Sequence, residues 1–141
     1  MPMNLPGRKT LTLEAARAIA SGAEAEALKN GWKVVIAIVD DGGHLVHLVR
    51  LDGTQTSSVD TAIGKARAAM GFRRPTRVLE EMVNNGRTAF VTLEGVVAMQ
   101  GGMPIDIGGE LIGAVGVSGV KASDDEAIAV AGIDALGRAL A

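Results

Sequence analysis

The amino-acid sequence predicts an α+β fold, in which helices pack on an antiparallel sheet of about five strands. Three observations lead to this fold class. Amphipathic segments of helical length lie near the start, in the middle and at the end of the chain, and β-branched apolar runs of strand length lie between them. Short turn signals join neighbouring runs, which is typical of antiparallel pairs. With 141 residues, the chain is expected to form one domain over residues 1–141.

Four helices are expected, over residues 13–30, 58–72, 77–84 and 124–140. The first follows Thr12, a good helix-capping residue, and stops at Asn30-Gly31, where a left-handed backbone can end a helix. Ser57 and Ser123 each precede an acidic residue by three positions, which is the spacing of a capping pair. Each of these three helices therefore has a start signal in the sequence.

Strands are expected over residues 32–39, 44–51, 96–99, 105–107 and 111–117. The run WKVVIAIV at 32–39 has no polar face, so it is expected to lie centrally in the sheet with both faces covered. The segment DDGG at 40–43 and the pair Gly108-Gly109 have the composition of tight hairpin turns.

Composition excludes several classes of protein. The chain has no cysteine, which rules out disulfides and thiolate sites, and its net charge of −2 with only three aromatic residues argues against a nucleic-acid partner. No apolar run reaches the ~18 to 20 residues of a membrane span, and the N-terminus lacks the core of a signal peptide, so we expect a soluble cytoplasmic protein with no membrane partner. A hydrophobic fraction of 48% predicts surface covered by another copy, and therefore a homo-oligomer, at least a dimer.

The stretch GGMPIDIGGELIGAVGVSG at 101–119 is unusually rich in glycine. It lacks the lysine of a phosphate-binding P-loop and the spacing of a dinucleotide fingerprint, so its second half is interpreted as a hairpin. Pro104 fixes its own backbone and biases Met103 toward an extended form, which leaves Gly101 and Gly102 to make the turn. Their amides are expected to face an anion or a carbonyl oxygen, in a loop that walls a pocket opposite Lys65, within one chain or across a subunit boundary.

The two histidines, His44 and His47, are three residues apart on one predicted strand. This spacing puts them on opposite faces of the sheet, so they cannot share a metal within one chain. His44 has two interpretations. It is either a partly buried histidine whose ring is satisfied by a backbone carbonyl, or a functional group that acts as an axial haem ligand or transfers a proton.

Lys65 lies at the border of the apolar stripe of the second predicted helix, flanked by Gly64, Ala66 and Ala68. Such a lysine usually extends its ammonium to water, but the small neighbours also leave room for an anionic ligand to approach. Arg50 is a further candidate, because its guanidinium can bind a carboxylate with two hydrogen bonds.

Five blocks of the sequence together resemble the GlcG-like family, which is also known through a haem-binding sensor protein and the C-terminal domain of a corrinoid adenosyltransferase. The blocks are LTLEAARAI, VIAIVDDGGHLVHLVRLDG, AIGKARAAMGFRRPT, QGGMPIDIGGELIGAVGVSG and DDEAIAVAGIDAL, and they cover most of the chain. The resemblance implies a profilin-like α+β fold and self-association into dimers or larger rings. Some members bind haem, and some are encoded beside catabolic enzymes for small hydroxy acids.

By position, the family pattern points to several residues of this chain. They are His44, Arg50, Lys65, the loop Gly101-Gly102-Met103-Pro104 and the strand end at Gly116 to Gly119. One departure is visible, since Ala68 stands where the family pattern leads us to expect a threonine. The missing hydroxyl makes any site beside Lys65 more apolar.

Two functions therefore remain open from the sequence. The first is a small-molecule binding protein, accessory to a catabolic pathway, that holds haem or a related tetrapyrrole near His44 and Lys65, with His44 on the iron. The alternative is an enzyme, a lyase or isomerase, in which Lys65 or His44 moves a proton on a small carboxylate.

Overall fold

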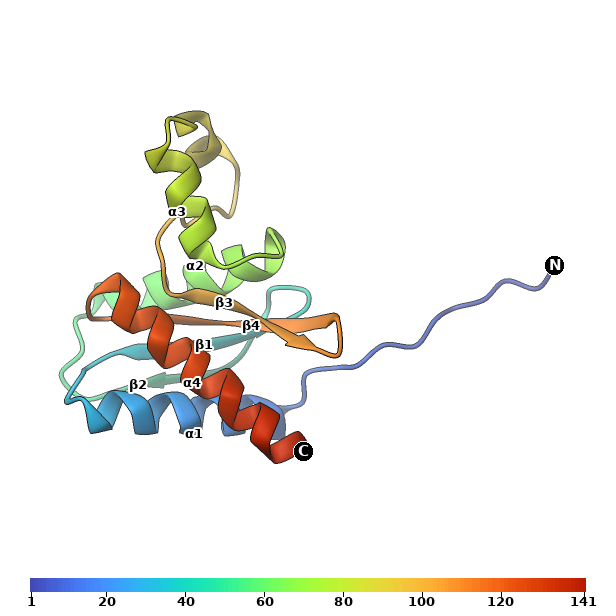
Figure 1. The fold of residues 1–141 in the computed structure, drawn as a ribbon, viewed down its shortest axis with the longest axis horizontal. Coiled ribbons are helices and arrows are strands. Elements are labelled where there is room, and N and C mark those ends of the chain that lie inside the picture. The colour runs from blue at the N-terminus through green and yellow to red at the C-terminus, as the bar shows by residue number, and fades with distance from the viewer.

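The computed structural model describes residues 1–141 and has an α+β fold, as predicted. Its elements are α1 (Leu13–Lys29), β1 (Val35–Asp40), β2 (Leu45–Arg50), α2 (Ser57–Gly71), α3 (Thr76–Asn84), the 3-10 helix η1 (Thr88–Thr92), β3 (Gly102–Ile107), β4 (Glu110–Ser118) and α4 (Ala122–Leu140). One antiparallel sheet has the strand order β2-β1-β4-β3. Figure 1 shows α2 on one face of this sheet and α1 with α4 on the other. No helix is long and apolar enough to span a membrane.

The sheet has four strands, so the prediction of five was wrong. The missing strand is the one expected over residues 96–99, which form no regular element. Val97 packs instead against α2 at Gly64, where an added Cβ would lie 2.7 Å from Val97 Cγ2. A strand needs a neighbour with free backbone groups, and the surface of a helix offers none.

β1 lies between β2 and β4, and its central position was predicted from its lack of a polar face. Ile36 and Ile38 point into the larger core cluster beneath α1 and α4, whereas Val35 and Ala37 pack on the side of α2. All four side chains are completely buried. The alternation follows from the two-residue period of a strand, and it gives the sheet two apolar faces that must both be covered.

Two expected capping pairs are not formed. Ser57 and Ser123 lie inside the first turns of α2 and α4, and the residues that precede these helices, Thr56 and Lys121, make no side-chain cap hydrogen bond. At the start of α4, the Lys121 carbonyl already accepts the N–H groups of Asp124 and Asp125, so the helix begins before the serine. Helix ends depend on such local backbone bonds, which spacing alone does not fix.

α2 packs unusually close to the sheet because Gly116 of β4 has no side chain. A Cβ added there would overlap the Ala62 carbonyl oxygen and lie 3.0 Å from Ala66 Cβ. This close approach fixes the height of α2 above the strands, and therefore the position of the two cationic residues that it carries, Lys65 and Arg67.

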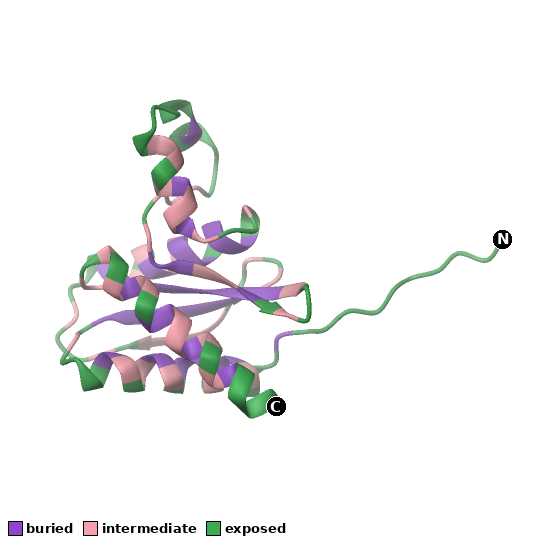
Figure 2. Ribbon diagram, in the orientation of Figure 1, coloured by how far each residue is buried: buried purple, intermediate pink, exposed green.

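α3 and the residues up to Gly101 form an arm that projects beyond α2 (Figure 1). A small apolar cluster holds the arm together, in which the rings of Phe72 and Phe90 lie 5.1 Å apart. Figure 2 shows that much of the arm is exposed, and Val91, Leu93 and Met99 each keep about half of their surface in contact with solvent, at 53%, 48% and 50%. This part of the molecule therefore has apolar surface that the chain itself leaves uncovered.

Candidate functional site

A rigid turn between β1 and β2 presents His44 at one end of the sheet. The Asp40 carboxylate oxygen Oδ1 accepts the backbone N–H groups of Gly42 and His44, at 3.0 and 2.9 Å. Gly43 adopts a φ of +80°, which glycine tolerates without strain. The turn is therefore fixed by its own hydrogen bonds, and the imidazole of His44 is exposed and makes none.

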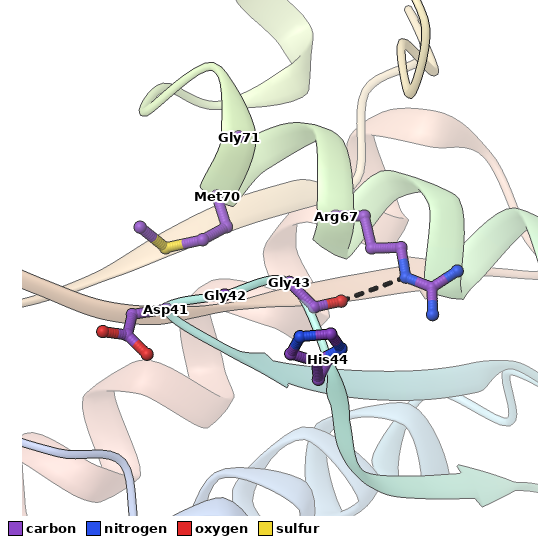
Figure 3. A pocket seen from close by; sticks show the side chains of 7 residues that line it. All are labelled: Asp41, Gly42, Gly43, His44, Arg67, Met70 and Gly71. Carbon is purple, nitrogen blue, oxygen red and sulfur yellow. Dashed lines mark hydrogen bonds between the residues drawn. The ribbon is translucent and has the colours of Figure 1, made fainter.

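The turn and α2 enclose a pocket of about 330 Å³ (Figure 3). Its lining residues are Asp41, Gly42, Gly43, His44, Arg67, Met70 and Gly71. Figure 3 shows Arg67 and Met70 extending from α2 toward the turn that carries His44. Arg67 Nε donates to the Gly43 carbonyl oxygen at 3.0 Å, and its two terminal nitrogens make no hydrogen bond or ion pair. The pocket therefore offers a free imidazole and a half-free guanidinium, a pair suited to a metal and to a carboxylate respectively.

Arg67 was not among the residues predicted from the sequence. Its spacing to Met70 and Gly71, three and four positions, places all three on one face of α2, and this spacing was a usable signal. What the sequence could not show is that this face meets the turn after β1, because that contact depends on how closely α2 packs on β4.

Lys65 lies in the interior and not in an open pocket. Its ammonium donates to the Val117 carbonyl oxygen at 2.9 Å and to Asp125 Oδ2 at 3.1 Å, and the two side chains are only 2% and 3% exposed. Burial raises the pKa of Asp125, while the charge of Lys65 and the N–H of Val120 oppose that rise. Lys65 therefore joins α2, β4 and the start of α4, and it lines none of the four pockets of the chain.

Gly101 and Gly102 lie in direct contact with Lys65, and not across a pocket from it. A Cβ on Gly101 would be 2.8 Å from Lys65 Nζ, and the Gly102 N–H donates to Thr76 Oγ1 at 2.8 Å. The expected pocket wall is thus corrected: within one chain, no cavity separates these glycines from the lysine, and the Gly102 amide is already bonded. Met103 and Pro104 belong to β3.

The predicted site residues are spread along the sheet. The Asp40 N–H donates to the His44 carbonyl, so His44 lies beside the end of β1. Lys65 contacts Val117, which pairs with Ile36 of β1. Ile36 comes four positions before Asp40, and four residues of a strand span roughly 13 Å. The single pocket expected near both His44 and Lys65 is therefore not formed within one chain. Arg50 pairs with Val35, farther still from the turn.

His47 pairs with Ile38, which points into the core cluster beneath α1 and α4, whereas the His44 pocket lies on the side of α2. The two histidines thus lie on opposite sides of the sheet. No group of three or more His, Asp or Glu side chains is placed to hold a metal ion. Any metal at this site must bring most of its own ligands, as a haem iron does.

Comparison with known proteins places this chain in a wider group. A family described as "Haem degrading protein HbpS-like" matches residues 11–134. Protein GlcG of Escherichia coli (strain K12) is 48% identical over 108 residues, which cover 77% of this chain and 81% of GlcG. Among solved structures, a double mutant of HbpS from Streptomyces reticuli superposes with a TM-score of 0.84 at 33% identity, covering 97% of both chains.

A structure described as a PduOC–haem complex has a TM-score of 0.82 at 26% identity and covers 90% of this chain and 95% of its own. The family match spans nearly the whole chain, and the fold agrees with that of both solved relatives. The chain is therefore a member of the HbpS-like family, to which the GlcG-like resemblance of its sequence pointed.

Proposed function

We propose that this protein binds haem, or a related tetrapyrrole, in the pocket between the β1–β2 turn and α2. One observation carries the proposal: the exposed imidazole of His44 shares an open pocket with the unpaired end of the Arg67 guanidinium. Imidazole is a common axial ligand of haem iron, and guanidinium groups pair with carboxylates such as the haem propionates. The haem-related descriptions of the family and of PduOC support a haem-binding role in general.

The side chains of the pocket have the chemistry to bind haem, and the pocket is large enough to hold part of it. His44 would hold the iron, Arg67 a propionate, and Met70 would contact the macrocycle. The Asp41 carboxylate is paired with Arg8, so its charge is offset where a propionate would approach. At about 330 Å³ the pocket is near the lower limit of ~300 to 1,000 Å³ for ligand sites, so one chain would enclose one edge of a tetrapyrrole. Bound haem would supply iron redox chemistry, and the chain supplies binding and orientation.

The test is a haem titration followed by the Soret absorbance. We expect saturation at one haem per chain for the natural protein, and a loss of the shifted Soret band in His44→Ala, because no other side chain of the pocket can ligate iron as strongly. His47→Ala is the matched control, since His47 lies on the other side of the sheet, and it should bind as the natural protein does. Equal Soret shifts in both variants would contradict the role of His44.

A second candidate is an enzyme that acts on a small carboxylate by proton transfer. The same pair favours it, with Arg67 holding the carboxylate and His44 moving the proton. Turnover separates the two functions, because a binding protein saturates without changing its ligand. Exchange of the α-proton of small 2-hydroxy acids in heavy water, followed by NMR and lost in His44→Ala, would favour the enzyme. Absence of α-proton exchange would contradict the enzymatic function.

We also propose that the chain forms a homo-oligomer through its exposed apolar arm. Val91 in η1, Leu93 directly after it and Met99 are apolar side chains that the chain leaves about half exposed. Sedimentation at micromolar concentration should therefore show a dimer or larger species, and Leu93→Glu should shift it toward the monomer. Glu94→Gln, at the neighbouring exposed position, is the control and should leave the assembly intact. A natural protein that sediments as a monomer would contradict this proposal.

A further inference from the structure

We infer a second small-molecule site, on the side of the sheet away from His44, that takes a monocarboxylate with an apolar body, such as a medium-chain acyl acid. It is a cavity of about 520 Å³, larger than the His44 pocket. Its lining residues are Lys9, Thr10, Thr12, Ala15, Ile107, Ile112, Leu136 and Leu140. The volume lies within the ~300 to 1,000 Å³ that ligand sites usually have.

The cavity has one apolar wall and one polar wall. Ile112 and Leu136 belong to the main core cluster and are only 5% and 3% exposed, so the floor of the cavity is continuous with the core. The polar wall comes from the segment before α1, which contributes Lys9, Thr10 and Thr12. Apolar walls with a few polar groups on one side are typical of sites for amphipathic ligands.

The segment that forms the polar wall is anchored at several points. The Lys9 N–H donates to Glu110 Oε2 at 2.8 Å, and Arg8 pairs with Asp41. Leu11 is buried beside Gly113, and Thr12 Oγ1 caps α1 by accepting the Ala15 N–H at 3.0 Å. The wall therefore belongs to the fold and is not a loose end lying across a groove.

The one cation among the lining residues, Lys9, is held by an exposed ion pair with Glu110. The backbone N–H of Lys9 donates to one oxygen of the Glu110 carboxylate, and this hydrogen bond is the largest cause of the lowered pKa of Glu110. The Lys9 ammonium lies 3.6 Å from the other oxygen, beyond hydrogen-bond distance, and its side chain is 54% exposed. Exposed ion pairs contribute little to stability, so this cation can turn from Glu110 to a ligand carboxylate.

The inference is independent of the proposed haem site. The two pockets share no lining residue, and this one lies beneath α1 and α4, whereas the His44 pocket lies beneath α2. Failure of one proposal would therefore leave the other standing.

The test is calorimetric titration of the full-length protein with octanoate. We expect one octanoate per chain, binding about tenfold weaker for 1-octanol, which lacks the charge, and no measurable heat for acetate, which lacks the apolar body. Ala15→Phe should abolish octanoate binding by filling the cavity. Ala127→Phe makes the same change on an exposed face of α4 and should leave binding unchanged.

Lys9→Gln provides a second test that does not disturb the core. It should weaken octanoate about tenfold while leaving 1-octanol unaffected. The inference is overturned if the natural protein shows no saturable octanoate binding, if Ala15→Phe binds as the natural protein does while folded by circular dichroism, or if Lys9→Gln weakens both ligands equally. It is also overturned if Ala15→Phe dissociates an oligomer, since the cavity would then be a contact between copies.

Discussion

Lys65→Met is expected to lower the free energy of unfolding by about 3–5 kcal/mol, the cost of leaving one member of a buried ion pair without its partner. In the natural protein the Lys65 ammonium bonds Asp125 and the Val117 carbonyl, and neither charged side chain has appreciable contact with water. The variant keeps the apolar stem but leaves the Asp125 carboxylate buried and uncompensated. Urea unfolding followed by circular dichroism measures the difference.

The double variant Lys65→Met/Asp125→Leu is the control. It removes both charges, so it should recover most of the stability that the single variant loses, as buried pairs replaced by apolar residues usually do. A double variant as unstable as Lys65→Met would show that the lysine acts through something other than this pair.

The stability deficit of Lys65→Met should also depend on pH. Burial raises the folded-state pKa of Asp125 above the unfolded value of about 3.9, and removal of Lys65 raises it further. A group with a raised folded pKa contributes stability that is present below the unfolded pKa and is lost as pH rises through the folded pKa. The difference between natural protein and variant should therefore shrink as pH falls from 7 toward about 4.

Gly116→Ala is expected to lower the free energy of unfolding by about 3 kcal/mol or more, the upper end of the usual cost of overpacking. The new methyl group would meet the backbone of α2 at Ala62 and the side chain of Ala66, and neither a helix backbone nor a packed methyl can turn aside as a flexible side chain does. α2 would have to lift from the sheet. Thermal unfolding and the near-ultraviolet circular dichroism of the variant test this directly.

Gly137→Ala is the matched control for Gly116→Ala. An added Cβ at Gly137 meets nothing within 4 Å, and in a helix this change stabilises by up to about 1 kcal/mol. A Cβ at Gly102 would overlap the Lys65 carbonyl and lie 2.8 Å from Thr76 Cγ2. Larger side chains there should damage the fold before they affect any ligand.

The regular elements could be predicted because their signals are local. The hairpin at Gly108-Gly109 is confirmed, with β3 ending at Ile107 and β4 beginning at Glu110, and both glycines have positive φ, at +61° and +90°. A two-residue turn with this geometry follows from glycine and from the alternating strands around it. Hydrophobic repeats of two residues for strands and of about four residues for helices therefore predicted most of the sheet and the helices.

The candidate site could be predicted only in part, because it depends on contacts between distant segments. His44 was found from its place after a turn, but Arg67 approaches it only through the packing of α2 on Gly116. Lys65 was recognised as unusual, yet its partner Asp125 is 60 residues away and resembled an ordinary residue at a helix start. Sequence spacing carries no information about such pairs.

The position of the iron in crystals grown with haem tests the central proposal most directly. Anomalous diffraction at the iron edge locates the metal independently of the shape of the ligand density. We expect one peak per chain within bonding distance of a His44 ring nitrogen, in the pocket lined by Arg67 and Met70. A peak at any other position, such as the cavity beside Lys9, or an iron with no contact to His44, would contradict the proposed haem site.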